Sequence, residues 1–180
     1  MKPVPKLTVT PGNSRKTIAL LGAFCLFLST IEYMIPKPLP FLRIGIANLP
    51  LMLALDIFPF PAFLVLTAIK ILGQALITGT LFSYVFLFSL AGTSLSALAM
   101  YGARRLFGRK LISFIGIGTL GAMISNLTQL ALAYIFIFGS LVRFIAAPFL
   151  AAGVITGAAL GLFCEVFTSR SKWYALYKIR

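Results

Sequence analysis

Long apolar runs are the feature that most constrains how this chain can fold. Of its 180 residues, 60% are hydrophobic and 11% are charged, against about 45–50% and about 25% in soluble globular domains. In a helix, about 20 apolar residues cross the roughly 30 Å hydrocarbon core of a bilayer. Runs of this length and number therefore predict an all-α integral membrane protein.

The apolar runs divide into six predicted spans that form one transmembrane domain over residues 17–167. The second span is the shortest, and a Pro-rich connection, Pro36–Pro40, precedes it. Basic tails at 1–16 and 168–180 flank the predicted six-helix bundle. The spans run from about Thr17 to Ile35, Ile44 to Phe58, Ala62 to Gly79, Leu81 to Tyr101, Leu111 to Phe138 and Leu141 to Phe167.

Small residues recur at a spacing of four in several of these spans. Gly153, Gly157 and Gly161 follow this spacing in the sixth span, and Gly118 and Ala122 follow it in the fifth. Because small residues let two helix backbones approach closely in a membrane, the pattern predicts tight packing of these spans against other helices.

The basic residues are distributed unevenly over the predicted connections. With six spans, both tails and the connection after the fourth span lie on one side, and each of these three segments holds four Lys or Arg. The other side holds only Lys37, Arg43 and Arg143. Because cytoplasmic loops carry an excess of Lys and Arg, we expect both termini to be cytoplasmic and the Pro-rich connection to face outward.

Several classes of function lack the residues that they require. The chain has no His and only two Cys, which excludes His-based catalysis and the common zinc clusters. Its three acids, Glu32, Asp56 and Glu165, are too few for a carboxylate-rich magnesium site. No phosphate-binding Gly-x-x-x-x-Gly-Lys-Ser/Thr loop is present, and the polar surface that nucleic-acid binding needs is missing. We expect a non-enzyme without metal or cofactor.

Lys70 lies about midway along the predicted third span. A charged side chain costs a few kcal/mol at the centre of a membrane helix, by insertion scales, unless it is paired or hydrated. Such a residue marks a ligand site or an ion pair by default. The alternative is that the span is displaced and that Lys70 extends its amine to the membrane interface.

Amide side chains provide the second set of candidates. Asn126 and Gln129 are three residues apart and share a helix face, where they would contact a ligand or join neighbouring helices. Asn48 opens the second span and would contact a ligand or cap that helix. Glu32 and Arg143 lie on the predicted outer side, and an outward pocket rich in cations favours an anionic solute. The candidate binding residues are Lys70, Asn48, Asn126, Gln129, Arg143, Glu32 and Gln74.

Several short motifs, taken in their order along the chain, resemble one family. They are the Pro-rich outer connection, Gly45-Ile-Ala-Asn48, the cation in the third span, Phe88-Ser-Leu-Ala-Gly92 with Ser96 and Met100, Gly121-Ala-x-x-Ser-Asn126-x-x-Gln129, and Gly153-x-x-Thr-Gly157. This order is similar to that of the Gx transporter family, also labelled heptaprenyl diphosphate synthase component I. That family resembles the substrate-binding S components of energy-coupling-factor (ECF) vitamin transporters.

The resemblance implies an S-component-like six-helix fold in a prokaryotic cytoplasmic membrane, with a binding site near the outer face. It also implies that Ala19-x-x-x-Ala23 docks an ECF-type coupling subunit. Two positions depart from the family pattern. Lys70 stands where Arg is common, and a single ammonium cannot reproduce a bidentate grip; Ser125 stands where His is common.

Two kinds of function remain. The first is a membrane-embedded S component that binds a vitamin-like, flavin-like or isoprenoid-derived anionic ligand from outside and depends on separate ATPases. The second is a non-catalytic membrane subunit associated with prenyl diphosphate or quinone biosynthesis, or with flavin- or quinone-linked electron transfer.

Overall fold

The structure is a computed structural model that describes residues 11–35 and 45–177, with side chains for 15–35 and 45–174. Every regular element in these ranges is a helix, which confirms the predicted all-α class. The elements are α1 Pro11–Met34, η1 Ile46–Asn48, α2 Leu49–Ala54, α3 Phe60–Ile77, α4 Tyr84–Leu111, α5 Phe114–Ala133, η2 Tyr134–Phe138, η3 Gly139–Leu141, α6 Val142–Arg170 and α7 Lys172–Tyr177.

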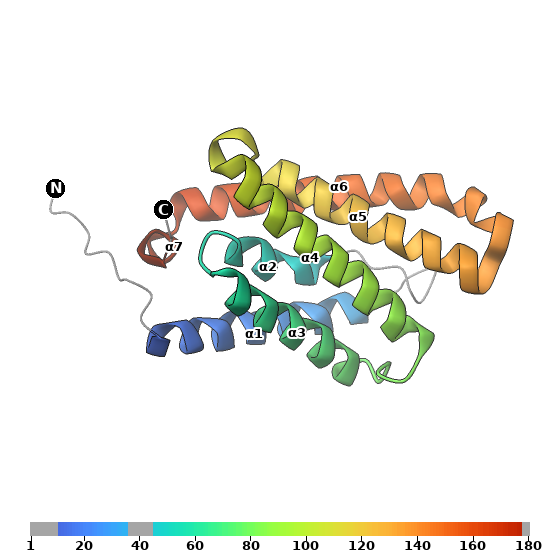
Figure 1. Ribbon diagram of the computed structural model, residues 1–180, viewed down its shortest axis with the longest axis horizontal. Helices are drawn as coiled ribbons and strands as arrows, with labels where there is room; N and C mark the ends of the chain where they lie inside the picture. Colours follow the sequence, from blue (N-terminus) through green and yellow to red (C-terminus); the bar gives the residue numbers. More distant parts are fainter. Residues whose placement is uncertain (1–10, 36–44, 178–180) are drawn as a thin grey trace, which may run out of the picture.

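Four helical stretches are long and apolar enough to cross a bilayer. The last of them contains both α5 and α6, which run antiparallel after a tight turn (Figure 1). The start of α1 and the whole of α7 lie at one end of the bundle (Figure 1). The turn between α5 and α6 lies at the other end (Figure 1). The stretches are Arg15–Met34, Phe60–Ile77, Tyr84–Leu111 and Phe114–Arg170.

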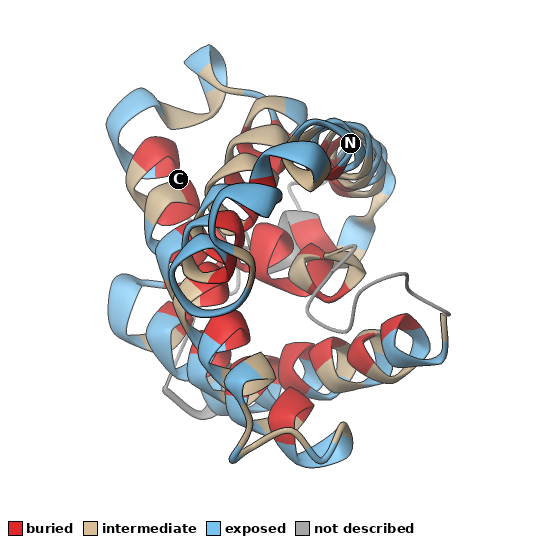
Figure 2. Cartoon of the chain, turned by 90° about the vertical axis from the view of Figure 1, so that its right-hand side faces the viewer, coloured by how far each residue is buried: buried red, intermediate tan, exposed pale blue. Residues whose placement is uncertain are grey.

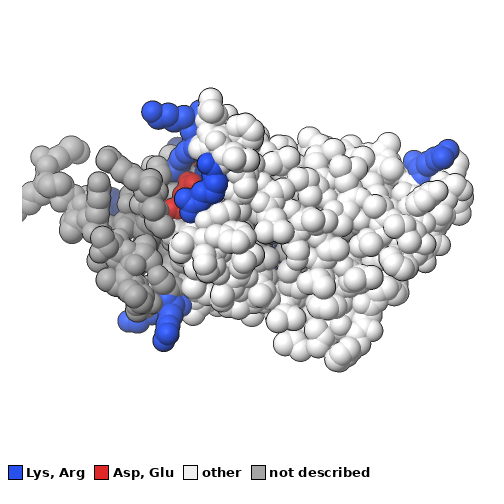
Figure 3. Space-filling model, in the orientation of Figure 1, with Lys and Arg blue, Asp and Glu red and all other residues white. Residues whose placement is uncertain are grey.

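The surface has the character of a membrane protein. Buried residues lie on the inward faces of the helices and exposed residues on the outward faces (Figure 2), yet many exposed residues are large and apolar, such as Phe27, Ile135 and Phe144. On the face shown in Figure 3, the described charged side chains lie toward the two ends and the surface between them is uncharged. A soluble protein would expose this apolar belt to water, so the chain is a membrane protein in contact with lipid.

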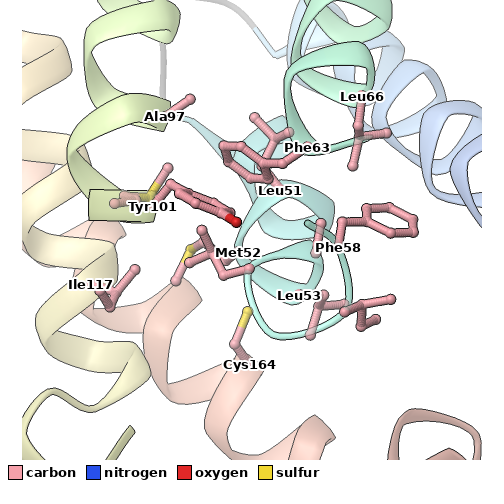
Figure 4. Close-up of a cluster of buried hydrophobic side chains, with 14 of the residues drawn as sticks. Leu51, Met52, Leu53, Phe58, Phe63, Leu66, Ala97, Tyr101, Ile117 and Cys164 are labelled. Carbon is pink, nitrogen blue, oxygen red and sulfur yellow. The ribbon is translucent and has the colours of Figure 1, made fainter. Parts of the chain in front are cut away.

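The segment predicted as the second span is much shorter than a span. The three residues of η1 and the six of α2 cover only about half of the hydrocarbon core at 1.5–2.0 Å per residue. All six residues of α2 are buried, and Leu51, Met52 and Leu53 pack into the cluster of Figure 4 with Tyr101 and Ile117. The apolar run reflects enclosure by protein, so the prediction of a complete span over Ile44–Phe58 is wrong in length.

Two other helices extend beyond their predicted ends. α1 begins at Pro11, six residues before the predicted start at Thr17. α4 continues past Tyr101 through Arg104 and Arg105, two of the basic residues predicted to form a connection, and reaches Leu111 after a break at Gly108, where φ is +64°. The sequence analysis placed these cations in a cytoplasmic connection, whereas Arg104 lies on the helix and is buried in an ion pair.

Glycines bring α5 and α6 into backbone contact. A Cβ atom added at Gly157 would lie 2.6 Å from the carbonyl oxygen of Gly118, and one added at Gly161 would lie 2.5 Å from the carbonyl oxygen of Phe114. Larger residues would force the helices apart. The small-residue spacing in the sequence therefore predicted this contact correctly.

Candidate functional site

Lys70 lies inside the bundle. Its side chain projects from α3 with a residue exposure of only 3%, about 15 Å along the helix from its start and about 10 Å from its end. The Nζ atom donates to Oδ1 of Asn48 at 2.5 Å and to Oγ1 of Thr93 at 3.4 Å. The amine therefore lies inside the bundle, about midway along α3.

Glu32 organises the turn that carries Asn48. The Glu32 carboxylate is 1% exposed and accepts the backbone N–H groups of Gly45 at 3.0 Å and Ala47 at 3.3 Å. Gly45 has a φ of +88°, in the left-handed region that favours glycine. The Asn48 side chain makes no capping bond to α2, because its oxygen faces Lys70.

A small cavity, lined by polar side chains together with glycines and apolar residues, adjoins this group. It lies between one wall formed by α1, η1, α2 and α3 and another formed by α4, α5 and α6, and the Lys70–Thr93 bond joins the two walls. Its volume is about 30 Å³, room for one or two water molecules. Glu32, Asn48, Lys70 and Gln74 line the first wall, and Thr93, Ser125, Asn126 and Thr156 line the second.

Unsatisfied oxygen atoms accompany the buried charge. Within the described residues, Oε1 of Gln74, Oγ of Ser89, Oγ of Ser96 and Oε1 of Gln129 are buried without a hydrogen-bond partner. Such atoms are few in folded proteins and each has a cost of about 1–3 kcal/mol. Gln74 lines the cavity, so its oxygen is a ready acceptor for a water molecule or a ligand.

The predicted site residues divide into two groups. Lys70, Asn48, Glu32 and Gln74 line the cavity, as does Asn126, whose Nδ2 also donates to the Phe149 carbonyl of α6 at 3.0 Å.

Gln129 and Arg143 are not among the residues that line the cavity. Gln129 is buried and donates to Oγ of Ser125 at 3.0 Å, whereas Arg143 is exposed at the start of α6. The predicted cations Lys37 and Arg43 lie outside the described residues, so Lys70 and Glu32 are the charged residues of the described lining.

Sequence reasoning missed Thr93 and Thr156 as cavity residues. Thr93 lies on one face of α4 with Ser89 and Ser96, at helical spacings of four and three, and all three are buried. A polar stripe of this kind in an apolar helix was the available signal.

A second buried polar cluster lies near the start of α1 and the end of α6. Arg104 of α4 binds Asp56 in a fork, with Nε–Oδ1 at 2.8 Å and Nη2–Oδ2 at 3.1 Å, and donates to the Ile112 carbonyl at 2.7 Å. The Tyr174 hydroxyl donates to Asp56 at 3.2 Å. Burial, and then the Asp56 carboxylate, raise the pKa of Tyr174 above its ordinary value near 10, which keeps this donor protonated.

Comparison with protein families shows a match to the family described as Heptaprenyl diphosphate synthase component I, over residues 21–167. The chain belongs to this family. The match extends from α1 to α6 and covers the residues that line the Lys70 cavity, together with Asp56 and Arg104, whereas Tyr174 lies beyond its end. The family resemblance in the sequence is thereby confirmed.

No curated protein matches this component I family chain, and no solved structure does.

Proposed function

We propose that this component I family member is the membrane-embedded binding component of a small-molecule uptake system. The observation that carries the proposal is the Lys70 ammonium, 3% exposed, facing a polar cavity at mid-bundle depth. Burying an ammonium in this setting is costly, and a bundle that needed only stability would place an apolar residue there. A ligand site would account for the buried ammonium of Lys70.

The donors and acceptors of the cavity indicate what the ligand carries. Lys70 supplies three N–H donors in all, which suit a carboxylate, a phosphate or a carbonyl oxygen. Oε1 of Gln74 is an unpartnered acceptor among the described residues, which suits an N–H or O–H group. A small anionic ligand with at least one donor group, such as a vitamin-like or flavin-like compound, fits both requirements.

The cavity is small in this structure. Its volume of about 30 Å³ is well below the roughly 300–1,000 Å³ of typical ligand sites. We infer that binding separates the two cavity walls, breaking the Lys70–Thr93 bond of 3.4 Å. We expect the ligand to enter from outside, because the distribution of cations favours cytoplasmic termini and the family resemblance implies a prokaryotic inner membrane with a binding site near its outer face.

Uptake would require a partner. Because the sequence has no nucleotide-binding loop, an ECF-type coupling subunit and ATPases would supply the energy. Ala19 and Ala23 are exposed on α1, where they suit close helix docking. Replacing Ala19 with Leu should abolish co-purification of a coupling subunit and leave ligand retention unchanged, whereas retained co-purification would contradict the docking role.

Retention of a natural ligand tests the binding function. The full chain would be extracted from its native membrane in mild detergent and analysed by native mass spectrometry. We expect a bound anionic compound of a few hundred daltons, which leaves the protein on denaturation. Protein purified at high yield with no retained compound, from cells grown on rich and on minimal medium, would contradict the proposal.

The second candidate function rests on the family description. A component I would act with another component of a prenyl diphosphate synthase, as a membrane subunit without catalysis of its own. One Asp in the whole sequence does not supply the clustered carboxylates that hold magnesium around a diphosphate. Co-purification of a prenyltransferase would favour this function, and its absence from a cross-linked native preparation would count against it.

A further inference from the structure

Two apolar grooves open on the outside of the bundle, near the end where α1 begins. The first has a volume of about 520 Å³ and the second about 400 Å³, both within the roughly 300–1,000 Å³ of ligand sites. Phe167 lines both grooves. The first is lined by Leu20, Leu21, Phe24, Leu53, Phe167 and Trp173, and the second by Phe163, Val166, Phe167, Arg170 and Ser171.

Exposed cations border these grooves. Arg170 lines the second groove, and Lys172 directly precedes Trp173, which lines the first. Lys16 lies one helical turn before Leu20 on the same face of α1, and all three cations are exposed. The nearby Glu165 faces α5 instead, where its Oε2 accepts the Phe114 N–H at 3.0 Å.

We propose that the two grooves bind one anionic diacyl phospholipid of the cytoplasmic leaflet. One acyl chain lies in each groove, on either side of Phe167, and the phosphate lies among Arg170, Lys172 and Lys16. Two apolar grooves that share Phe167 offer one place for each acyl chain, and the cations that border them suit a lipid phosphate better than an apolar partner helix. In this arrangement Trp173, next to the exposed Lys172, would lie at the interfacial depth that tryptophan favours.

The site differs from ordinary lipid contact because it selects the headgroup. Basic residues near the surface attract anionic lipids with about fivefold affinity per cation. Three cations around one phosphate therefore predict a preference of tenfold or more for phosphatidylglycerol over phosphatidylcholine. This preference does not depend on whether the Lys70 cavity binds a solute.

The single tryptophan of the sequence makes the site directly observable. The full chain would be reconstituted in phosphatidylcholine vesicles that contain increasing fractions of phosphatidylglycerol with brominated acyl chains, which quench tryptophan on contact. A parallel series would use brominated phosphatidylcholine. We expect half-maximal quenching of Trp173 at a fraction of phosphatidylglycerol at least tenfold lower than that of phosphatidylcholine.

Matched variants assign the preference to the groove cations. The double substitution Arg170→Gln and Lys172→Gln leaves Lys16 as the one remaining groove cation and should reduce the preference to about fivefold or less. Lys110→Gln, an exposed cation on α4 that lines neither groove, should preserve the preference. Equal quenching by both lipids, an unchanged preference in the double variant, or no quenching by either lipid would overturn the proposal; the last result would mean that protein covers the grooves.

Discussion

Asn48 and Asp56 lie at opposite ends of one buried segment, and each holds a cation from a different helix. The oxygen of Asn48 accepts from Lys70 of α3, and the Asp56 carboxylate binds Arg104 of α4. The intervening α2 is buried over its whole length. This buried segment is therefore fixed at one end to α3 and at the other to α4.

The Asp56 cluster should contribute strongly to stability through Arg104. The Asp56 side chain is only 10% exposed, and Arg104→Gln removes the guanidinium that neutralises its carboxylate. This change should lower the free energy of unfolding by about 3 kcal/mol. Arg109 is the matched control, since it lies 3.6 Å from the same carboxylate and its side chain is 29% exposed. Arg109→Gln should have an effect of about 1 kcal/mol or less. Unfolding by SDS in mixed micelles measures the free energy of unfolding of both variants. An equal loss of stability in Arg104→Gln and Arg109→Gln would contradict the predicted order.

Tyr174 should make stability depend on pH in the alkaline range. Its pKa is raised in the folded protein, so the unfolded chain loses the tyrosine proton first, from about pH 10 upward. The free energy of unfolding should therefore be unaffected by this group below about pH 9 and should fall as the pH rises above 10. Thermal unfolding between pH 8 and 11 should show a smaller decline for Tyr174→Phe than for the unmodified protein. Parallel curves would mean that the hydroxyl is not buried against Asp56.

The contact between α5 and α6 should tolerate no added methyl group at Gly157. A Cβ there would lie 2.6 Å from the Gly118 carbonyl oxygen, so Gly157→Ala should lower the free energy of unfolding by about 1–3 kcal/mol through overpacking. The control is Gly102→Ala on α4, where an added Cβ meets nothing within 4 Å. That change should be neutral or raise stability by up to about 1 kcal/mol through helix propensity. The opposite order of the two variants would refute the close approach of these helices.

Much of the fold follows from local properties of the sequence. The lengths of the apolar runs predicted the membrane-spanning helices, and the glycine spacing predicted tight packing of α6. The second run could not be interpreted in this way, because apolar residues enclosed by protein and by lipid look alike in a sequence. The helical continuation of α4 was missed for a related reason: Arg104 is stabilised by Asp56, 48 residues earlier, and pairing at that distance leaves no local signal.

The candidate site was predictable where a polar residue stands alone in an apolar run. Lys70 and Gln74 stand out by this criterion, and both line the cavity. Gln129 is also a polar residue in an apolar run, but it is not among the lining residues. The packing of the helices decides which helix face points into the cavity, and the sequence of one helix does not show this. Thr93 was missed because a hydroxyl in a membrane helix has an ordinary local explanation, a bond to its own backbone.

Dependence of ligand retention on Lys70 is the most direct test of the proposed function. Lys70→Met keeps the length of the side chain and removes its charge, and Lys110→Met makes the same change at an exposed position. Quantitative mass spectrometry of compounds released from equal amounts of folded protein would compare both with the unmodified chain. The account predicts at least a tenfold loss of retained anionic compound in Lys70→Met and no loss in Lys110→Met. Equal retention by all three proteins would contradict it.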